Sequence, residues 1–314
     1  MAALLLRRLR DLVLILLIVG TMMFFVVRLM PGDPAMAILG PMARPQDVEA
    51  LRQSMGLTGS LWSQYLSWIG NVVQGDFGTS ITYHASVIPV VAEHFLPTLT
   101  LALISTAVSF AVAVVITFWN AVAPRNPVAS LLTRMSGLGM AIPDFWIALI
   151  LVLVFAVTLR WFPSSGYVGL LSDPAAAAGT LVLPVICLVI GQSALFILTL
   201  RESVLGELPQ TYLRTARVKG LSERQVMLGH VLPNALMPLV TQLGSNFAMM
   251  MGGIVIIESI FVIPGLGSLL LGAVFTRDFP LVQGVTLFVA LMFVLVNLLV
   301  DLSYALLDPK VRVS

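Results

Sequence analysis

The stretch ELPQTYLRTARVKGLSERQVMLGHVLPNALMP, residues 207–238, is a polar and basic segment between two long apolar runs. Pro209 suits the first turn of a helix, where a missing N–H costs nothing. Gly220 suits the left-handed residue that stops a helix. The first half of the stretch therefore predicts a short helix that begins near Pro209 and ends at Gly220.

A second helix is predicted directly after this stop. Ser222 and Gln225 have the S-x-x-Q spacing of a capping box, in which the hydroxyl and the amide each bind an unpaired backbone N–H. Leu232-Pro233 is expected to end or kink this helix. A capped, rigid pair of helices can transmit force from a partner that grips it, or it can rest on anionic lipid as a basic interfacial helix. The spacing alone leaves both interpretations open.

Composition places the rest of the chain in a membrane. Of the 314 residues, 59% are hydrophobic and only 10% are charged, too few charges to cover a water-facing surface of this size. Cys187 is the only cysteine, so an intrachain disulfide and a cysteine metal cluster are excluded. The formal charge of +2 without a dense basic face gives no support to a nucleic-acid partner.

We expect an all-α integral membrane protein with six transmembrane helices. A helix needs roughly 20 mostly apolar residues to cross the hydrocarbon core. A β-barrel is disfavoured, because the apolar runs lack alternation. The six predicted spans are 12–29, 97–121, 136–159, 180–200, 238–262 and 282–306.

The distribution of Lys and Arg predicts that both termini are cytoplasmic. With that orientation, twelve of the 17 basic residues lie on the cytoplasmic side and five on the other. The chain then divides into an N-terminus with the first span, 1–30, an extracytoplasmic segment, 31–96, and a five-helix core, 97–314. The largest cytoplasmic segment, 201–237, lies within this core.

The extracytoplasmic segment is amphipathic rather than disordered. Its aromatic side chains Trp62, Tyr65 and Trp68 are typical of residues anchored at a membrane surface. A small cap that lies on the bilayer explains them at least as well as a ligand-binding role.

Catalytic motifs are missing from the sequence. No G-x-x-x-x-G-K-[ST] motif occurs, and the chain has only two lysines, Lys219 and Lys310, so it cannot cradle ATP in the P-loop manner. His84, His94 and His230 are too far apart for H-E-x-x-H. We therefore expect a chain that is not an enzyme and binds no cofactor or metal itself.

Polar residues within the spans are the remaining candidates for function, because each is costly in lipid. They fit a translocation path, and they fit structural pairing between helices or with helix ends equally well. Glu258 precedes a Pro-Gly break at Pro264-Gly265, whose freed backbone groups it could bind. The candidates are Asp144, Gln242, Asn246, Glu258 and Asp301.

Residues 207–238 resemble the EAA loop of ABC importer permeases. The pattern of that loop is E-A-A, three residues, Gly, nine residues, then I-x-L-P. Anchored on Gly220, the pattern places Arg214-Thr215-Ala216 at E-A-A and Leu232-Pro233 at L-P. Ala216, Gly220, Leu232 and Pro233 match, whereas Arg214, Thr215 and His230 depart from it. The run from Tyr212 to Leu221 is similar to the version in dipeptide, oligopeptide and nickel importers.

Further motifs in the same order and spacing extend this resemblance over nearly the whole chain. They are Arg28-Leu29-Met30-Pro31-Gly32-Asp33-Pro34, Gly75-Asp76-Phe77-Gly78-Thr79-Ser80, Leu96-Pro97-Thr98-Leu99, Ile142-Pro143-Asp144-Phe145-Trp146, Glu258 to Gly267, Arg277-Asp278-Phe279-Pro280 and Leu307-Asp308-Pro309.

The resemblance implies a type I ABC importer permease in the bacterial cytoplasmic (inner) membrane, similar to the B-type, first permease subunit of dipeptide or nickel systems. Implied partners are a second homologous permease, two ATP-binding subunits that carry ATP and Mg, an extracytoplasmic solute-binding protein and membrane lipid. The implied ATPase-coupling residues are Tyr212, Arg214, Thr215, Ala216, Arg217, Lys219, Gly220, Leu232 and Pro233.

The cargo stays open. Peptides, that is di- or oligopeptides, are the first expectation, with nickel or a metal chelate, glutathione and opines as alternatives. An alternative of another class is a secondary transporter or channel that works without an ATPase.

Overall fold

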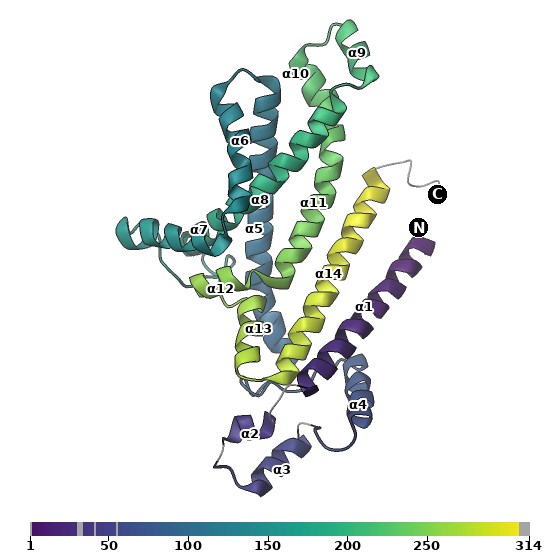
Figure 1. Ribbon diagram of the computed structural model, residues 1–314, viewed down its shortest axis with the longest axis vertical. Coiled ribbons are helices and arrows are strands. Elements are labelled where there is room, and N and C mark those ends of the chain that lie inside the picture. The colour runs from purple at the N-terminus through teal and green to yellow at the C-terminus, as the bar shows by residue number, and fades with distance from the viewer. Residues whose placement is uncertain (1, 30–33, 41, 55, 308–314) are drawn as a thin grey trace. The chain divides into compact units, whose positions relative to one another are not determined.

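The computed structural model describes residues 2–29, 34–40, 42–54 and 56–307. These residues form helices, with one isolated bridge between Thr79 and Ser86 (Figure 1). Within them, five helices are long and apolar enough to cross a membrane, or up to seven spans if two broken helix pairs each count as one. The predicted all-α membrane architecture is confirmed. The motif residues 30–33 and 308–309 and the basic residues Lys310 and Arg312 lie outside the described residues.

The chain divides into two compact units, and the first consists of residues 1–95 and 266–292. It contains α1 (Ala2–Leu29), α2 (Pro34–Leu39), α3 (Pro45–Ser54), α4 (Leu61–Val73), the beginning of α5 (Val87–Val122), α13 (Leu266–Phe275) and the beginning of α14 (Phe279–Leu307).

Two apolar groups hold the first unit together. Val27, Val87 and Leu281 are buried in a cluster that α1, α5, α13 and α14 share. The ring of Phe24 in α1 packs against Tyr65 and Trp68 of α4. Helix α4 is thus fixed to α1 by the aromatic residues that the sequence predicted to lie at a membrane surface.

The second unit consists of residues 96–265 and 293–314. It contains the remainder of α5 and of α14, together with α6 (Pro127–Ala141), α7 (Asp144–Leu151), the π-helix η1 (Val152–Thr158), α8 (Pro174–Glu207), α9 (Thr211–Val218), α10 (Glu223–Val226), the π-helix η2 (Met227–Val231), α11 (Leu232–Gly253) and α12 (Val255–Phe261).

Helix α8 is the centre of the second unit. It packs against α6, α7 and α11. Phe196, Leu200 and Val204 of α8 are buried in one cluster with residues of α9, η2 and α11. Because this cluster extends from the apolar helices to α9, the short helix has a rigid base.

The predicted third span, 136–159, is wrong as a single straight helix. α6 ends at Ala141, and the following helical stretch, residues 144–158, is turned by 105°. Pro143 explains the break, because a proline disfavours the helical conformation of the residue before it. Ile142 is accordingly extended, with φ −94° and ψ 124°. Continuous hydrophobicity does not report such a change in direction.

The predicted fifth span, 238–262, is also wrong in its limits. The apolar helical stretch covers residues 223–252 and α11 ends at Gly253. α12 is a separate short helix that ends at Val262 in the left-handed conformation, with φ 53°. The other four predicted spans fall within α1, α5, α8 and α14, although α5 begins ten residues earlier than expected, at Val87.

Candidate functional site

Helix α9 presents one apolar face to the protein and one polar face to its surroundings. Leu213 and Ala216 are buried in the cluster with Phe196 and Val231. On the opposite face Arg214, Thr215 and Lys219 are exposed. Val218 is an apolar residue that is nevertheless 88% exposed. α9 therefore has an outer surface with positive charge and one uncovered apolar side chain.

Gly220 ends α9 as the sequence predicted. Its φ is +86°, a left-handed value that L-residues with a side chain rarely adopt. The N–H of Gly220 donates to the Arg217 carbonyl at 3.0 Å, and the N–H of Leu221 donates to the Ala216 carbonyl at 3.3 Å. This pair of bonds is a Schellman motif. The predicted start was wrong: Pro209 precedes the N-cap Gln210 and lies in the turn after α8.

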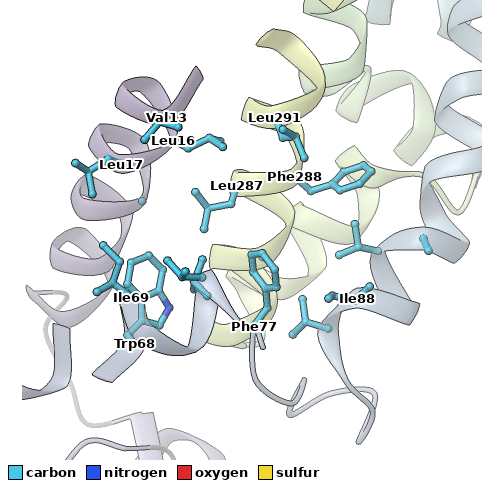
Figure 2. A pocket seen from close by; sticks show the side chains of 17 residues that line it. Val13, Leu16, Leu17, Trp68, Ile69, Phe77, Ile88, Leu287, Phe288 and Leu291 are labelled. Atoms are coloured by element: carbon cyan, nitrogen blue, oxygen red, sulfur yellow. The ribbon is translucent and has the colours of Figure 1, made fainter. Parts of the chain in front are cut away.

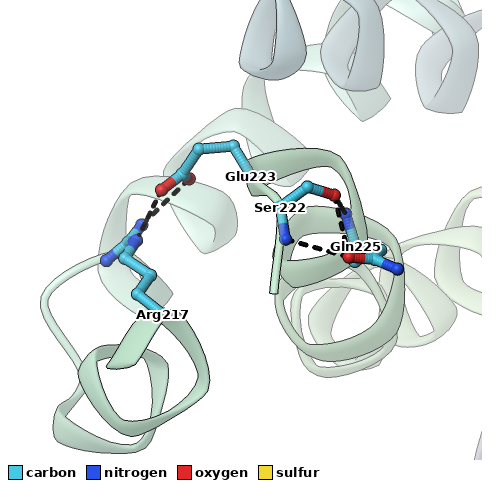
Figure 3. A network of polar contacts seen from close by, with 4 residues as sticks. All are labelled: Arg217, Ser222, Glu223 and Gln225. Atoms are coloured by element: carbon cyan, nitrogen blue, oxygen red, sulfur yellow. Dashed lines mark hydrogen bonds and ion pairs between the residues drawn. The ribbon is translucent and has the colours of Figure 1, made fainter. Parts of the chain in front are cut away.

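An ion pair and a capping box fix the turn between α9 and α10 (Figure 3). The Arg217 Nε donates to the Glu223 carboxylate at 2.7 Å, and this hydrogen bond raises the pKa of Arg217. The Gln225 amide oxygen accepts from the Ser222 N–H at 2.9 Å, and the Ser222 hydroxyl accepts from the Gln225 N–H at 3.4 Å. The predicted capping box is confirmed.

Tyr212 connects α9 to the helices on either side of it. Its hydroxyl donates to the Glu207 carboxylate at the end of α8, at 2.6 Å, and accepts from Asn234 Nδ2 of α11, at 2.8 Å. Its ring meets the His230 ring edge-on at 6.5 Å. Desolvation and the Glu207 acceptor raise the pKa of the Tyr212 hydroxyl, so it remains a proton donor at neutral pH.

Leu232-Pro233 does not end the second helix. α10, the π-helix η2 and α11 follow one another without a break, and Pro233 lies in the first turn of α11. Proline lacks the N–H for a regular helical bond and its ring crowds the carbonyl four residues earlier. The wider π-turn directly before it lets the helix continue. The predicted second short helix is thus the beginning of a long one.

Asp144 is the first residue of α7, just after the bend that follows α6. It is exposed and stands next to Phe145 and Trp146, which are also exposed. Its backbone carbonyl accepts from Cys187 Sγ at 3.1 Å. Its Oδ1 lies 3.1 Å from the point where a Cβ would stand on Gly191, so α8 leaves room for the carboxylate.

Glu258 has the opposite environment. It lies on α12, which packs against α7, and its exposure is 0%. The Thr98 hydroxyl donates to its Oε1 at 2.6 Å. A Cβ on Gly265 would overlap the Glu258 carboxylate, which therefore occupies the space beside this glycine. The Glu258 carboxylate is thus enclosed beside the Pro-Gly break and bonded to Thr98.

The other three polar candidates are on α11 and α14. Gln242 and Asn246 are half-buried on α11. The Asn246 Nδ2 atom is buried and has no hydrogen-bond partner among the described residues. The backbone of Asp301 is helical, but its side chain lies outside the described residues.

Sequence reasoning missed two buried polar networks. In the second unit, the Gln192 amide of α8 donates to Met250 Sδ at 2.7 Å and accepts from the Ser109 hydroxyl at 3.2 Å, which links three apolar helices. In the first unit, Asp278 is fully buried and accepts from the Ser80 hydroxyl at 2.6 Å. Ser80 and Asp278 lie in two of the motifs that carry the resemblance, but no sequence signal pairs them, and the only signal for Gln192 was a strongly polar residue within an apolar run.

Two family models match the chain. Residues 113–313 match the model described as binding-protein-dependent transport system inner membrane component, and residues 1–102 match the model of the N-terminal part of the same membrane component. Together these models cover nearly the whole sequence. The chain belongs to this family.

The permease is thus a multi-pass protein of the bacterial inner membrane and a subunit of an ABC importer. Membership implies partners of three kinds, a second permease, ATPase subunits and a binding protein.

Named relatives cover the permease from end to end. A putative peptide transport system permease of Brucella abortus is 38% identical over 312 residues, 99% of each chain. An oligopeptide transport system permease of Bacillus subtilis is 36% identical and covers 99% of this chain and 100% of its own. A glutathione transport system permease of Escherichia coli is 37% identical, with 98% and 97% covered.

A solved structure has the same fold. The inward-facing MetNI methionine ABC transporter matches with a TM-score of 0.56 at 16% identity, over 70% of this chain and 97% of the other. The expectation of a type I permease fold is confirmed.

Proposed function

We propose that the permease is one of two permease subunits that together form the translocation path of a peptide importer. Relatives in peptide and oligopeptide transport that are 36–38% identical over almost the full length support peptides as cargo. The 37% identical relative in glutathione transport makes this tripeptide-sized solute the second candidate. The other candidate cargoes, which are nickel or a metal chelate and opines, are supported only by the sequence resemblance.

The coupling role that we assign to α9 rests on its geometry. Leu213 and Ala216 tie α9 to the core of the second unit, whereas Val218 and Arg214 point outward with no described residue to cover them. A helix held in this way moves with the core when a partner grips its outer face. We infer that an ATP-binding subunit, which carries ATP and Mg, docks on this face from the cytoplasm, and that both termini lie on the same side.

Gly220 offers the sharpest test of this coupling. A Gly220→Val substitution forces a β-branched residue into a left-handed position, so α9 loses its Schellman stop although nothing lies within 4 Å of the new Cβ. We expect uptake of a labelled dipeptide in proteoliposomes to fall at least about tenfold, with the complex still assembled. The matched control is Gly206→Val in α8, where the space is equally open and φ is not left-handed.

Full transport and full stimulation of ATP hydrolysis in the Gly220→Val complex would contradict the coupling role. Proteoliposomes without ATPase subunits provide a second test, because an ABC permease should then move no solute. Uptake under those conditions would support the alternative of a stand-alone transporter. Competition with unlabelled oligopeptide or glutathione ranks the candidate cargoes.

Asp144 is the residue that we assign to the translocation path. An exposed carboxylate within apolar helices is too costly to face lipid, so it must face a partner subunit or an aqueous path. It stands at the bend after α6, beside Trp146, which is 53% exposed. A path between two permeases would bring the amine of a peptide to this carboxylate. Glu258, in contrast, we assign to structure because its carboxylate is enclosed and bonded.

A further inference from the structure

An apolar pocket of about 470 Å³ opens within the first unit, between α1, α4 and the beginnings of α5 and α14 (Figure 2). Leu16 of α1, Trp68 of α4, Phe77 of the following loop and Leu287 of α14 form its walls. Every side chain around it is hydrocarbon, with the indole N–H of Trp68 as the single polar group. The pocket lies entirely within one unit and plays no part in the coupling or the path argued above.

This pocket is unsuited to water, and leaving it empty is unfavourable. A buried water molecule needs two to four polar partners, and only one N–H is available in these walls. An empty space of this size deprives the wall side chains of dispersion contacts, which destabilises the fold. The occupant that matches the walls is therefore a hydrocarbon.

The helices around the pocket cannot move closer together, because they are already in contact next to it. A Cβ on Gly20 of α1 would stand 3.1 Å from the Trp68 ring, and a Cβ on Gly284 of α14 would overlap Val87 of α5. These two glycines bring their helices as near to their neighbours as the backbone allows. The spacing of these helices therefore limits how far the pocket can narrow.

The surroundings of the pocket favour lipid over protein as the source of this hydrocarbon. α1 and α14 are both apolar enough to cross the bilayer, and Val13 at the edge of the pocket is 56% exposed. Interfaces between transmembrane helices are enriched in small residues, whereas the pocket lining here consists mostly of large apolar side chains. The aromatic residues Trp62 and Tyr65 of α4 are typical of the headgroup level, where an acyl chain begins.

We propose that this pocket binds one acyl chain of a membrane glycerophospholipid, with α4 near the headgroup and the chain running along α1 and α14. The bound chain completes the packing of α1, the least buried of the candidate spans, against the rest of the first unit. The proposal is independent of the cargo and of the coupling role of α9.

Photolabelling of the assembled transporter tests the proposal. The probe is phosphatidylethanolamine with a diazirine on its acyl chain, mixed into proteoliposomes and activated by light, and labelled peptides are mapped by mass spectrometry. Ala92 lines the pocket and is exposed, so Ala92→Phe fills the space without entering the core. We expect labelling of residues 61–73 and 284–291 to fall at least about fivefold in this variant.

Ala111→Phe is the matched control, because Ala111 is an exposed alanine on the same helix, α5, away from the pocket. Its pocket labelling should equal that of the unaltered protein. If Ala92→Phe fails to assemble, Ile88→Trp at the pocket edge fills the same space from another position. Unchanged labelling in the filled variants would overturn the proposal. So would an absence of pocket labelling in the assembled transporter together with labelling of the isolated subunit, because a partner subunit would then cover the pocket.

Discussion

Two acidic residues stand beside breaks in the apolar helices, and their environments differ completely. Asp144 follows the break at Pro143 and is exposed, with only its backbone carbonyl bonded to α8. Glu258 precedes the break at Val262–Gly265 and is fully buried, with its carboxylate bonded to Thr98. α7 and α12, which carry them, pack against each other. A charge in a membrane helix is therefore not by itself a sign of a transport path.

The largest expected effect is that of Glu258→Ala. It removes the Glu258 carboxylate as an acceptor of the buried Thr98 hydroxyl and opens a cavity beside Gly265, so we expect a loss of about 3–5 kcal/mol of stability. Thermal unfolding of the purified permease measures it, with Glu202→Ala, an exposed acid on α8, as the control. If Glu258→Ala unfolds at the original temperature and abolishes only transport, Glu258 belongs to the path and the contrast with Asp144 fails.

Thr98→Val probes the same contact from its other side. The substitution keeps the shape of the side chain but leaves the Glu258 carboxylate without this donor, so stability should fall by about 1–3 kcal/mol. Thr100→Val is the matched control, since the Thr100 hydroxyl donates to the Leu96 carbonyl within its own helix. Equal unfolding temperatures for the two variants would show that the Thr98–Glu258 hydrogen bond does not stabilise the fold more than the Thr100 bond within its own helix.

Asp144→Asn should act on transport and leave folding unchanged. If the carboxylate attracts the amine of the peptide, its neutralisation raises the KM for dipeptide uptake about tenfold, or about 1.4 kcal/mol. Asp173→Asn is the control, because asparagine caps α8 as well as aspartate does. An Asp144→Asn complex with the original KM and a lowered unfolding temperature would make Asp144 a structural residue like Glu258.

Gly191→Ala should give the smallest change. Its new Cβ would stand 3.1 Å from Asp144 Oδ1 and displace the carboxylate slightly without removing its charge. We expect a rise in KM of about threefold, or about 0.6 kcal/mol. Gly179→Ala, on the same helix with no atom within 4 Å of the new Cβ, should leave the KM unchanged. A similar KM in both variants would contradict a role for the Asp144 carboxylate in the translocation path.

Local structure in the coupling segment was predictable from the sequence. The left-handed stop at Gly220 and the capping box of Ser222 and Gln225 depend on contacts between residues at most five positions apart. The continuation of the helix through Pro233 was not predictable, because a π-turn that accommodates a proline has no distinct sequence pattern. The bend at Pro143 within the predicted span 136–159 also became known only from the structure.

The other polar contacts join residues that are far apart in the sequence, so the sequence did not predict them. The donor to Glu258 comes from Thr98, 160 positions away, and Ser80 and Asp278 are separated by 198 positions. Gln192 meets Met250 in the same way across two apolar helices. A sequence read residue by residue marks each of these as costly in lipid but does not say which partner offsets the cost.

Hydrophobicity, motif spacing and local capping are properties of the chain read in order, so the sequence alone identified a membrane protein, its family, the helix stop at Gly220 and the capping box of Ser222 and Gln225. The enclosure of Glu258, the exposure of Asp144 and the pocket between α1, α4 and α14 became known only from the packing of the helices. Burial depends on which helices meet, so two residues equally costly in lipid have opposite environments once one of them is enclosed by its neighbours.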